Sequence, residues 1–207
     1  TIGRLAFRGC TSLRKLIIPA SVNFIGDSAF EGCSSLVDVS LPSSLEAIEE
    51  KTFTRCSSLK SIDIPNSVKS IGKNAFKGCT ELVSISIPPN VKAIEDWTFS
   101  GCSSLKIVII PDSVESIRRS AFRRCSALTV LTIPKSVTSI GESAFHGCLN
   151  LKEINITSDE IKIGRSAFLE CTSLLKINVR PLLNHISIWK QSFILQGLQR
   201  VNILLIT

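Results

Sequence analysis

Several residue types recur along this chain at a constant interval of 23 residues. All eight cysteines keep that interval, and eight phenylalanines and eight leucines keep it with them. A unit of this length with one apolar side cannot bury that side alone, so its copies must stack on one another. The repeat therefore predicts a solenoid with one continuous apolar core. Its cysteines are Cys10, Cys33, Cys56, Cys79, Cys102, Cys125, Cys148 and Cys171.

One unit of the repeat contains a short strand signal. In the third copy, Leu59, Ile62 and Ile64 alternate with Ser61 and Asp63. Alternation of apolar and polar side chains, rich in β-branched residues, predicts a strand with one buried face. The proline that follows most copies has no amide hydrogen to donate, so we expect it to end the strand. Stacked copies would form one parallel sheet of about nine short strands.

The rest of the unit returns the chain to the next strand. A second apolar pair, such as Val68 and Ile71, starts the return path. The A-F-x-G-C stretch is too short for a full helix, so a single helical or 3₁₀ turn is expected there. One column of the return path holds glycines, for which a tight turn with positive φ is expected: Gly26, Gly72, Gly141 and Gly164.

The last repeat departs from the pattern. Arg180 takes the place of the proline and Gln196 falls in the cysteine column, whereas Leu198, Val201 and Ile203 restore the strand signal. We therefore expect a single solenoid domain over residues 1–207, with an irregular last repeat at residues 180–207. Neither end shows a convincing polar cap, so the chain is expected to be a segment of a longer protein.

Composition narrows the class of protein. Hydrophobic residues make up 44% of the chain and charged residues 20%, which indicates a globular protein rather than a disordered one. The formal net charge of +7 is spread along the sequence, so nucleic acid is not an expected partner. The longest apolar stretches are far too short to span a membrane.

Taken together, the Leu-x-x-Ile-x-Ile strand, the proline after it, the A-F-x-x-C turn and the 23-residue period resemble the BspA-like leucine-rich repeat family of bacterial and protist surface proteins. The resemblance covers residues 2 to about 203. It implies a right-handed leucine-rich repeat solenoid with a concave parallel sheet and a convex side of turns and short bridges. It also implies adhesion or binding to a host protein, at the cell surface or after secretion. It assigns no catalytic residue and no cofactor.

Eight cysteines raise the question of a zinc site or of disulfides. Zinc sites usually bring two ligands close in sequence, and no two cysteines here are close. Adjacent copies could approach disulfide distance, but their side chains should run parallel and point into the core. We expect each cysteine to be a small core residue with a free thiol.

Catalytic chemistry has few candidates. His146 and Cys148 could pair a base with a thiol nucleophile. Other copies carry Arg, Glu or Lys in the histidine column, so His146 is expected to be a surface residue. His185 lies in the irregular last repeat without an obvious partner. No phosphate loop, dinucleotide fingerprint, nucleophile elbow or zinc-protease motif is present, and we expect no enzymatic activity.

A dense basic cluster is the one charge feature that stands out. It consists of Arg118, Arg119, Arg123 and Arg124, and it could bind an anion such as a sulfated glycan. The alternative is charge pairing with carboxylates one repeat away, which we favour because such pairs cancel the local field. Those carboxylates are Glu95, Asp96 and Glu142. Asn155, Ile156 and Thr157 also form a glycosylation sequon.

The outward columns of the strands are the best candidates for binding a partner, because they vary while the core columns do not. Ile107, Ile109, Val130 and Thr132 are expected to form an apolar patch on the sheet, which is a typical signal of a partner site. Ordinary β-propensity of an exposed sheet explains them equally well. The candidates around the patch are Asp63, Ser84, Ser86, Glu153 and Asn155.

These features favour a non-enzymatic scaffold that binds a protein on its sheet, because solenoids present long surfaces suited to that role. The ligand could be a host or matrix protein. The first alternative is a structural spacer within a large repeat protein. A weaker alternative is a hydrolase with an unrecognised thiol site.

Overall fold

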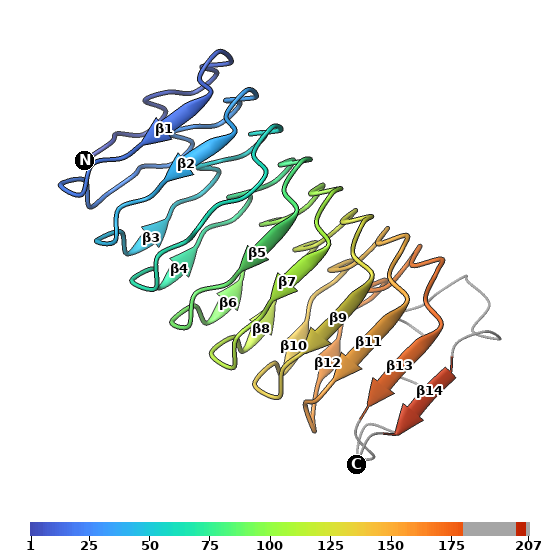
Figure 1. The fold of residues 1–207 in the computed structure, drawn as a ribbon. Helices are drawn as coiled ribbons and strands as arrows, with labels where there is room; N and C mark the ends of the chain where they lie inside the picture. Colours follow the sequence, from blue (N-terminus) through green and yellow to red (C-terminus); the bar gives the residue numbers. More distant parts are fainter. Residues whose placement is uncertain (180–201, 206–207) are drawn as a thin grey trace.

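A computed structural model of the chain describes residues 1–179 and 202–205. These residues form a solenoid of about seven turns built from parallel strands, and the described part contains no helix. In Figure 1 the strands nearest the viewer point down and to the left while successive coils advance down and to the right. That geometry defines a right-handed coil, as predicted.

The longer strands line one side of the solenoid, which we call the strand face (Figure 1). Consecutive strands of this face are parallel, as the repeat predicts. The described residues form eight such strands, close to the predicted nine: β1 (Lys15–Ile17), β2 (Asp38–Ser40), β5 (Ser84–Ser86), β7 (Ile107–Ile109), β9 (Val130–Ile133), β11 (Glu153–Ile156), β13 (Lys176–Val179) and β14 (Asn202–Leu205).

The strand face is not one continuous sheet. Its strands belong to three separate sheets, β1–β2, β5–β7 and β9–β11–β13–β14. The predicted strand of the third copy is wrong, because residues 61–64 form no ladder with either neighbour. Leu59 and Ile62 of that copy are nevertheless buried as predicted, so the coil keeps its core contacts while its backbone leaves the sheet.

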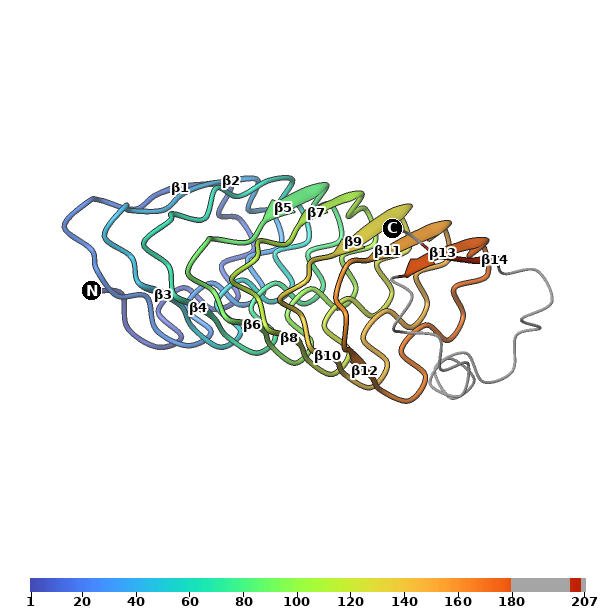
Figure 2. The same cartoon turned by 90° about the horizontal axis from the view of Figure 1, so that it is seen from below.

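A second set of parallel strands, divided between two sheets, lines the opposite side of the solenoid, where the family resemblance implied turns and short bridges. Figure 2 shows its strands along the edge opposite to the longer strands. Each strand has only two residues, so the alternation by which strands are recognised in a sequence has no room to appear. These strands are β3 (Ala47–Ile48), β4 (Ser70–Ile71), β6 (Ala93–Ile94), β8 (Ser116–Ile117), β10 (Ser139–Ile140) and β12 (Lys162–Ile163).

The last described strand corrects the predicted alignment of the final repeat. The sequence pattern equates Ile203 with Val179, but in the structure Ile203 pairs with Ile177 and Leu205 with Val179. The strand is thus shifted by two residues. A shift of two keeps every side chain on its own face of the sheet, which is why the apolar pattern alone could not detect it. Residues 180–201, with His185 and Gln196, lie outside the described residues.

Repeated apolar columns form the core. Seven consecutive pairs of phenylalanine rings stack with centroids 5.3 to 5.6 Å apart and planes within 13° of parallel. From Phe30 to Phe168 these rings are at most 1% exposed. The leucines of the strand signal are buried from Leu36 onward. Stacking of like residues on like residues therefore gives one core along the whole axis, as the repeat predicts.

The A-F-x-G-C segment forms consecutive turns instead of the predicted helical or 3₁₀ turn. Its N–H groups alternate between two kinds of partner: Cys33 donates to Phe30 within its coil, whereas Phe30 donates to Thr52 of the next coil. Two residues per coil have positive φ, as Ser28 (55°) and Gly32 (75°) illustrate. A helix would direct these N–H groups within one coil, so bonding between coils excludes it.

The prediction for the glycine column is also wrong. Gly26, Gly72, Gly141 and Gly164 do not have positive φ. A Cβ built on Gly141 would lie 2.6 Å from the backbone of Arg118 and of Arg119 in the preceding coil. These glycines are therefore explained by the close approach of two coils, which leaves no room for a side chain.

Candidate functional site

The strand face exposes a group of large apolar side chains at its centre. Ile107, Ile109 and Val130 are 57%, 58% and 50% exposed, and Thr132 is exposed beside them. Each comes from a position that alternates with a buried residue, since Val108 and Leu131 pack against the core between them. The alternation of the strands therefore places these four side chains on the surface, as the sequence predicts.

A hollow of about 200 Å³ lies beside this group, where the third coil leaves the sheet. Asp63 and Ser61 line one side of it, and Ser86, Ile107 and Ile109 line the other. Ser86 and Ile109 are paired residues of β5 and β7, which fixes their spacing. The hollow thus joins apolar side chains to a carboxylate and hydroxyl groups, a combination suited to a side chain of a partner protein.

The predicted site residues fall into two groups. Asp63, Ser86, Ile107 and Ile109 line the hollow, whereas the other four belong to β9 and β11. Strands β7 and β9 belong to different sheets, so no backbone ladder joins the two groups. The second group comprises Val130, Thr132, Glu153 and Asn155, in which Val130 pairs with Glu153 and Thr132 with Asn155.

Two residues of the second group make side-chain bonds with the next coil. Glu153 accepts a hydrogen bond from the amide of Asn178 (2.7 Å) and lies 3.4 Å from the amine of Lys176. The same amide of Asn178 also donates to the side-chain oxygen of Asn155. Sequence reasoning did not connect these four residues, although Asn155 and Asn178 are neighbours in one column. Their engagement with one another makes Glu153 and Asn155 less available to a partner.

The structure corrects the prediction for the basic cluster. Among residues 1–179 and 202–205, none of the eight ion pairs includes Arg118, Arg119, Arg123 or Arg124. Asp96, one of the expected partners, accepts the backbone N–H of Arg119 (3.1 Å) and lies 3.7 Å from Lys73. The predicted neutralisation by side-chain pairing is therefore not seen.

Arg123 packs against an aromatic ring instead. Its guanidinium lies 5.7 Å from the ring centroid of Trp97, and the amine of Lys77 lies 5.1 Å from the same centroid. A cation over an indole ring gains electrostatic attraction from its π-electrons. Trp97 thus lies between two cations from the coils before and after it. The repeat does not predict this contact, because Trp97 occupies a different column from Lys77 and Arg123.

The cysteine thiols have a structural role in every described coil after the first. From Cys33 to Cys171, each Sγ donates to the carbonyl of the phenylalanine 26 residues earlier, at 3.1 to 3.3 Å. These seven thiols are buried and free, whereas Cys10 is exposed. Burial raises the pKa of the Cys102 thiol to about 12 and that of Cys148 well above its ordinary value. The thiols of Cys102 and Cys148 are therefore protonated donors, as expected of core residues rather than nucleophiles.

His146 is not the solvated residue that its column predicts. Its side chain is only 15% exposed, and its Nε2 lies 3.1 Å from the carboxylate of Glu170 in the next coil. The pairing explains why a histidine is held against the surface at this position. Its neighbour Cys148 donates to the carbonyl of Phe122, so the two side chains face different partners.

Two kinds of feature are absent from residues 1–179 and 202–205. No group of three or more His, Cys, Asp or Glu side chains in them is arranged to hold a metal ion. Within the same ranges no helix has the length and apolar character needed to cross a membrane.

Comparison with known protein families gives one match. The model of the BspA type leucine rich repeat region, in six copies, matches residues 1–129 and 98–205. Together the two ranges cover nearly the whole chain. Among curated proteins no sequence matches significantly.

Solved structures supply two informative likenesses. A leucine-rich repeat protein from Bacteroides ovatus is 30% identical, with a TM-score of 0.51, over 86% of this chain and 58% of that one. A leucine-rich repeat protein of T. pallidum is 31% identical, with a TM-score of 0.59, over 84% of this chain and 70% of that one. The chain thus spans less than two thirds of the B. ovatus protein.

Proposed function

Because the chain belongs to the BspA-type leucine-rich repeat family, we propose that it is a non-enzymatic scaffold that binds a protein partner on its strand face. The partner is a host or matrix protein, and the scaffold acts at the cell surface or after secretion, as the family resemblance implies. One observation carries the proposal. Ile107, Ile109 and Val130 are at least half exposed, and the first two line a hollow together with Asp63 and Ser86.

The physical reason is the cost of leaving this group in water. When a partner covers large apolar side chains on a surface, the free energy falls by about 25 cal/mol for each Å² buried. The hydroxyl groups and carboxylate around the hollow then orient the partner by hydrogen bonds. The core columns have no comparable freedom, because every coil needs the same residue there.

The direct test replaces Ile109 and Val130 with Asp. Each substitution removes an apolar contact, and the new carboxylate loses its hydration in the interface without gaining an opposite charge. Binding should therefore weaken at least tenfold. The measurement is binding of the chain to immobilised collagen, fibronectin and laminin, with circular dichroism to confirm that the variant is folded.

Ile17 supplies a matched control. It occupies the same strand column as Ile109 but lies four coils away and is 67% exposed. Ile17→Asp introduces the same charge on the same face and should leave binding unchanged. Equal losses in both variants would indicate a nonspecific charge effect and would contradict the proposed site.

The alternative is a structural spacer within a large surface protein. Engagement of Glu153 and Asn155 with Lys176 and Asn178 favours it, because those side chains then stabilise the coil stack. Under this alternative, Ile109→Asp and Val130→Asp change the binding of none of the tested matrix proteins.

A further inference from the structure

Charged residues are unevenly distributed around the solenoid. We define the basic edge as the seven residues between each core phenylalanine and the following strand, for example 54–60 and 100–106. Over the eight copies from 8–14 to 169–175, the basic edge holds nine Lys or Arg and three Glu. The other positions of residues 1–179 hold twelve Lys or Arg and fourteen Asp or Glu. The positive charge of the described chain is therefore concentrated on one edge.

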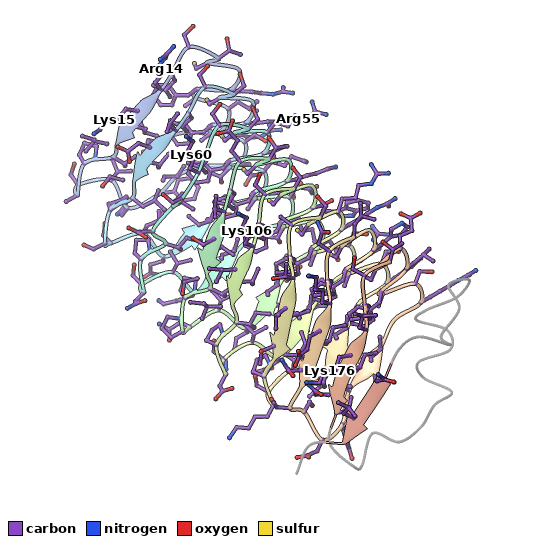
Figure 3. All side chains as sticks on the ribbon, turned by 45° about the vertical axis from the view of Figure 1, so that its right-hand side comes forward. Arg14, Lys15, Arg55, Lys60, Lys106 and Lys176 are labelled. Carbon is purple, nitrogen blue, oxygen red and sulfur yellow. The ribbon has the colours of Figure 1, made fainter. Side chains whose placement is uncertain are left out.

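The last position of the basic edge carries a regular row of cations. In alternate coils it is occupied by Arg14, Lys60, Lys106 and Lys152, all of which are exposed. We call these four residues the basic row. Figure 3 shows Arg14, Lys60 and Lys106 following one another along the solenoid. Since neighbouring coils are about 4.8 Å apart, alternate coils place one cation roughly every 10 Å.

The basic row keeps its charge. None of the ion pairs found within residues 1–179 and 202–205 includes a member of the row. Of the edge carboxylates, Glu31 pairs with Arg8 (3.4 Å) and Glu170 with His146 (3.1 Å). The third, Glu81, lies in the coil between Lys60 and Lys106. Within residues 1–179 and 202–205, Glu81 is thus the one edge carboxylate that forms no ion pair with another edge residue. The four cations of the basic row outnumber it.

The coils between the cations carry an uncharged residue in the same column. These residues are Val37 and Val83, both 41% exposed, and Thr129; Leu175, which is 54% exposed, follows the last cation. Serines accompany the cations: Ser58 and Ser104 stand two residues before Lys60 and Lys106, across a buried leucine. The surface therefore alternates a cation, with a serine nearby in the sequence, and an uncharged step.

We propose that the basic edge binds a linear polysaccharide that carries an anionic group on every second sugar. One pyranose ring is about as long as one coil step, so charged sugars would meet the cations and neutral sugars would meet the uncharged steps. Charge-assisted hydrogen bonds hold the anionic groups, and serine hydroxyls bond to sugar hydroxyls. The C–H faces of the neutral rings contact Val37 and Val83.

The spacing argues against two other polyanions. Duplex DNA carries a charge about every 1.7 Å, far denser than one cation in roughly 10 Å. Single-stranded nucleic acids need aromatic side chains on which bases stack, and the row offers aliphatic ones. A membrane surface is attracted by a two-dimensional basic patch, whereas these cations form one line. A linear polymer of matching period fits the line best.

The experiment measures binding of the chain to hyaluronan and unsulfated chondroitin oligosaccharides, both of which have a charged group on every second sugar. The double variant Lys60→Gln with Lys106→Gln should bind about 25-fold more weakly, at about fivefold for each cation. The control Arg118→Gln with Arg119→Gln removes the same charge outside the basic edge and should change binding less than twofold. Equal weakening in both variants, or no binding by the unchanged protein, overturns the proposal.

Two further arms identify the ligand class and separate this site from the protein-binding site. The row from Arg14 to Lys152 spans six coil steps, roughly 30 Å, so affinity should rise with oligosaccharide length until the row is covered. Tighter binding of a DNA duplex or of anionic vesicles, with the same loss in the row variant, overturns the assignment to a polysaccharide. The Ile109→Asp variant should keep its affinity for the polysaccharide, since the hollow and the basic row do not share residues.

Discussion

Each described coil holds two residues with positive φ, and most of them are not glycine. Arg55 and Arg124 have φ of 60° in a column where other coils carry glycine. An L-residue in this conformation costs about 1–2 kcal/mol because its Cβ approaches a carbonyl oxygen. The turn tolerates that cost because hydrogen bonds to the neighbouring coils fix the backbone on both sides, as for the N–H of Arg55 and the carbonyl of Lys77.

Arg55→Gly should therefore stabilise the protein. Glycine removes the cost of the positive φ in the folded state, and this exceeds the stability lost because glycine gains more conformational entropy on unfolding. We expect the free energy of unfolding to rise by about 0.5–1 kcal/mol. Arg118→Gly is the control: Arg118 is exposed but does not have positive φ, and glycine there should destabilise by a similar amount. Urea unfolding measures both, and a loss of stability in Arg55→Gly would contradict the strain argument.

A second prediction at the scale of one residue concerns Gly141. Its Cβ position is 2.6 Å from the backbone of the preceding coil, so Gly141→Ala must push two coils apart. We expect a loss of roughly 1–3 kcal/mol, the usual range for overpacking. Gly3 stands in the same column with no atom within 4 Å of its Cβ position, and Gly3→Ala should be almost neutral. Thermal unfolding of the two variants separates the effects.

Within one element, stacking makes the cost of a core change depend on its place along the axis. Phe99 lies between two rings, with centroids 5.5 and 5.3 Å away, and is fully buried. Phe99→Ala should cost about 3–5 kcal/mol, because a cavity opens between coils that the backbone ladders hold in place. Phe7 contacts one ring and is 39% exposed, so Phe7→Ala should cost less than half as much. Equal losses in denaturant unfolding would mean that the stack does not act as one element.

The elements also show how far the sequence pattern reaches. Burial of Leu59 and Ile62 follows from the repeat, and it is observed even where the coil leaves the sheet. The break in the sheet itself could not be predicted, because residues 61–64 carry the same strand signal as their neighbours. Backbone pairing depends on the spacing of adjacent coils, and that spacing is a property of the packed stack.

Across the whole molecule, the buried thiols act together on stability at high pH. Burial raises the pKa of six of them in the folded state: Cys33, Cys56, Cys79, Cys102, Cys125 and Cys148. In the unfolded chain they ionise near pH 8.5, so above that pH the unfolded state binds fewer protons than the folded state. Stability is then fully present below about pH 8 and decreases as pH rises toward the folded values.

We therefore expect the urea midpoint of the reduced protein to fall between pH 8 and 9.5. Each thiol contributes a slope that approaches 1.4 kcal/mol for each pH unit, by the usual linkage. Cys102→Ala removes one such group and should show a shallower pH dependence together with a lower stability at pH 7. A midpoint that stays constant over this range would contradict the burial of protonated thiols.

For the candidate site, the sequence supplied the exposed columns and the structure supplied their neighbours. Alternation along each strand is enough to place Ile107, Ile109 and Val130 on the surface, because successive side chains point to opposite faces. The hollow beside them lies where the third coil leaves the sheet, a place that the repeat does not predict. Separation of β7 from β9 likewise divides the predicted patch between two sheets.

The 23-residue period by itself determined the parallel solenoid, its core columns and the direction of its side chains. Whether a side chain is buried depends on its position within one repeat unit, and that position recurs with the sequence. The tertiary structure alone decided the pairing of the two-residue strands, the breaks in the strand face, the partner of His146 and the close approach at Gly141. Those features depend on the distance and offset between neighbouring coils, which the whole stack sets through packing and hydrogen bonds rather than any one unit.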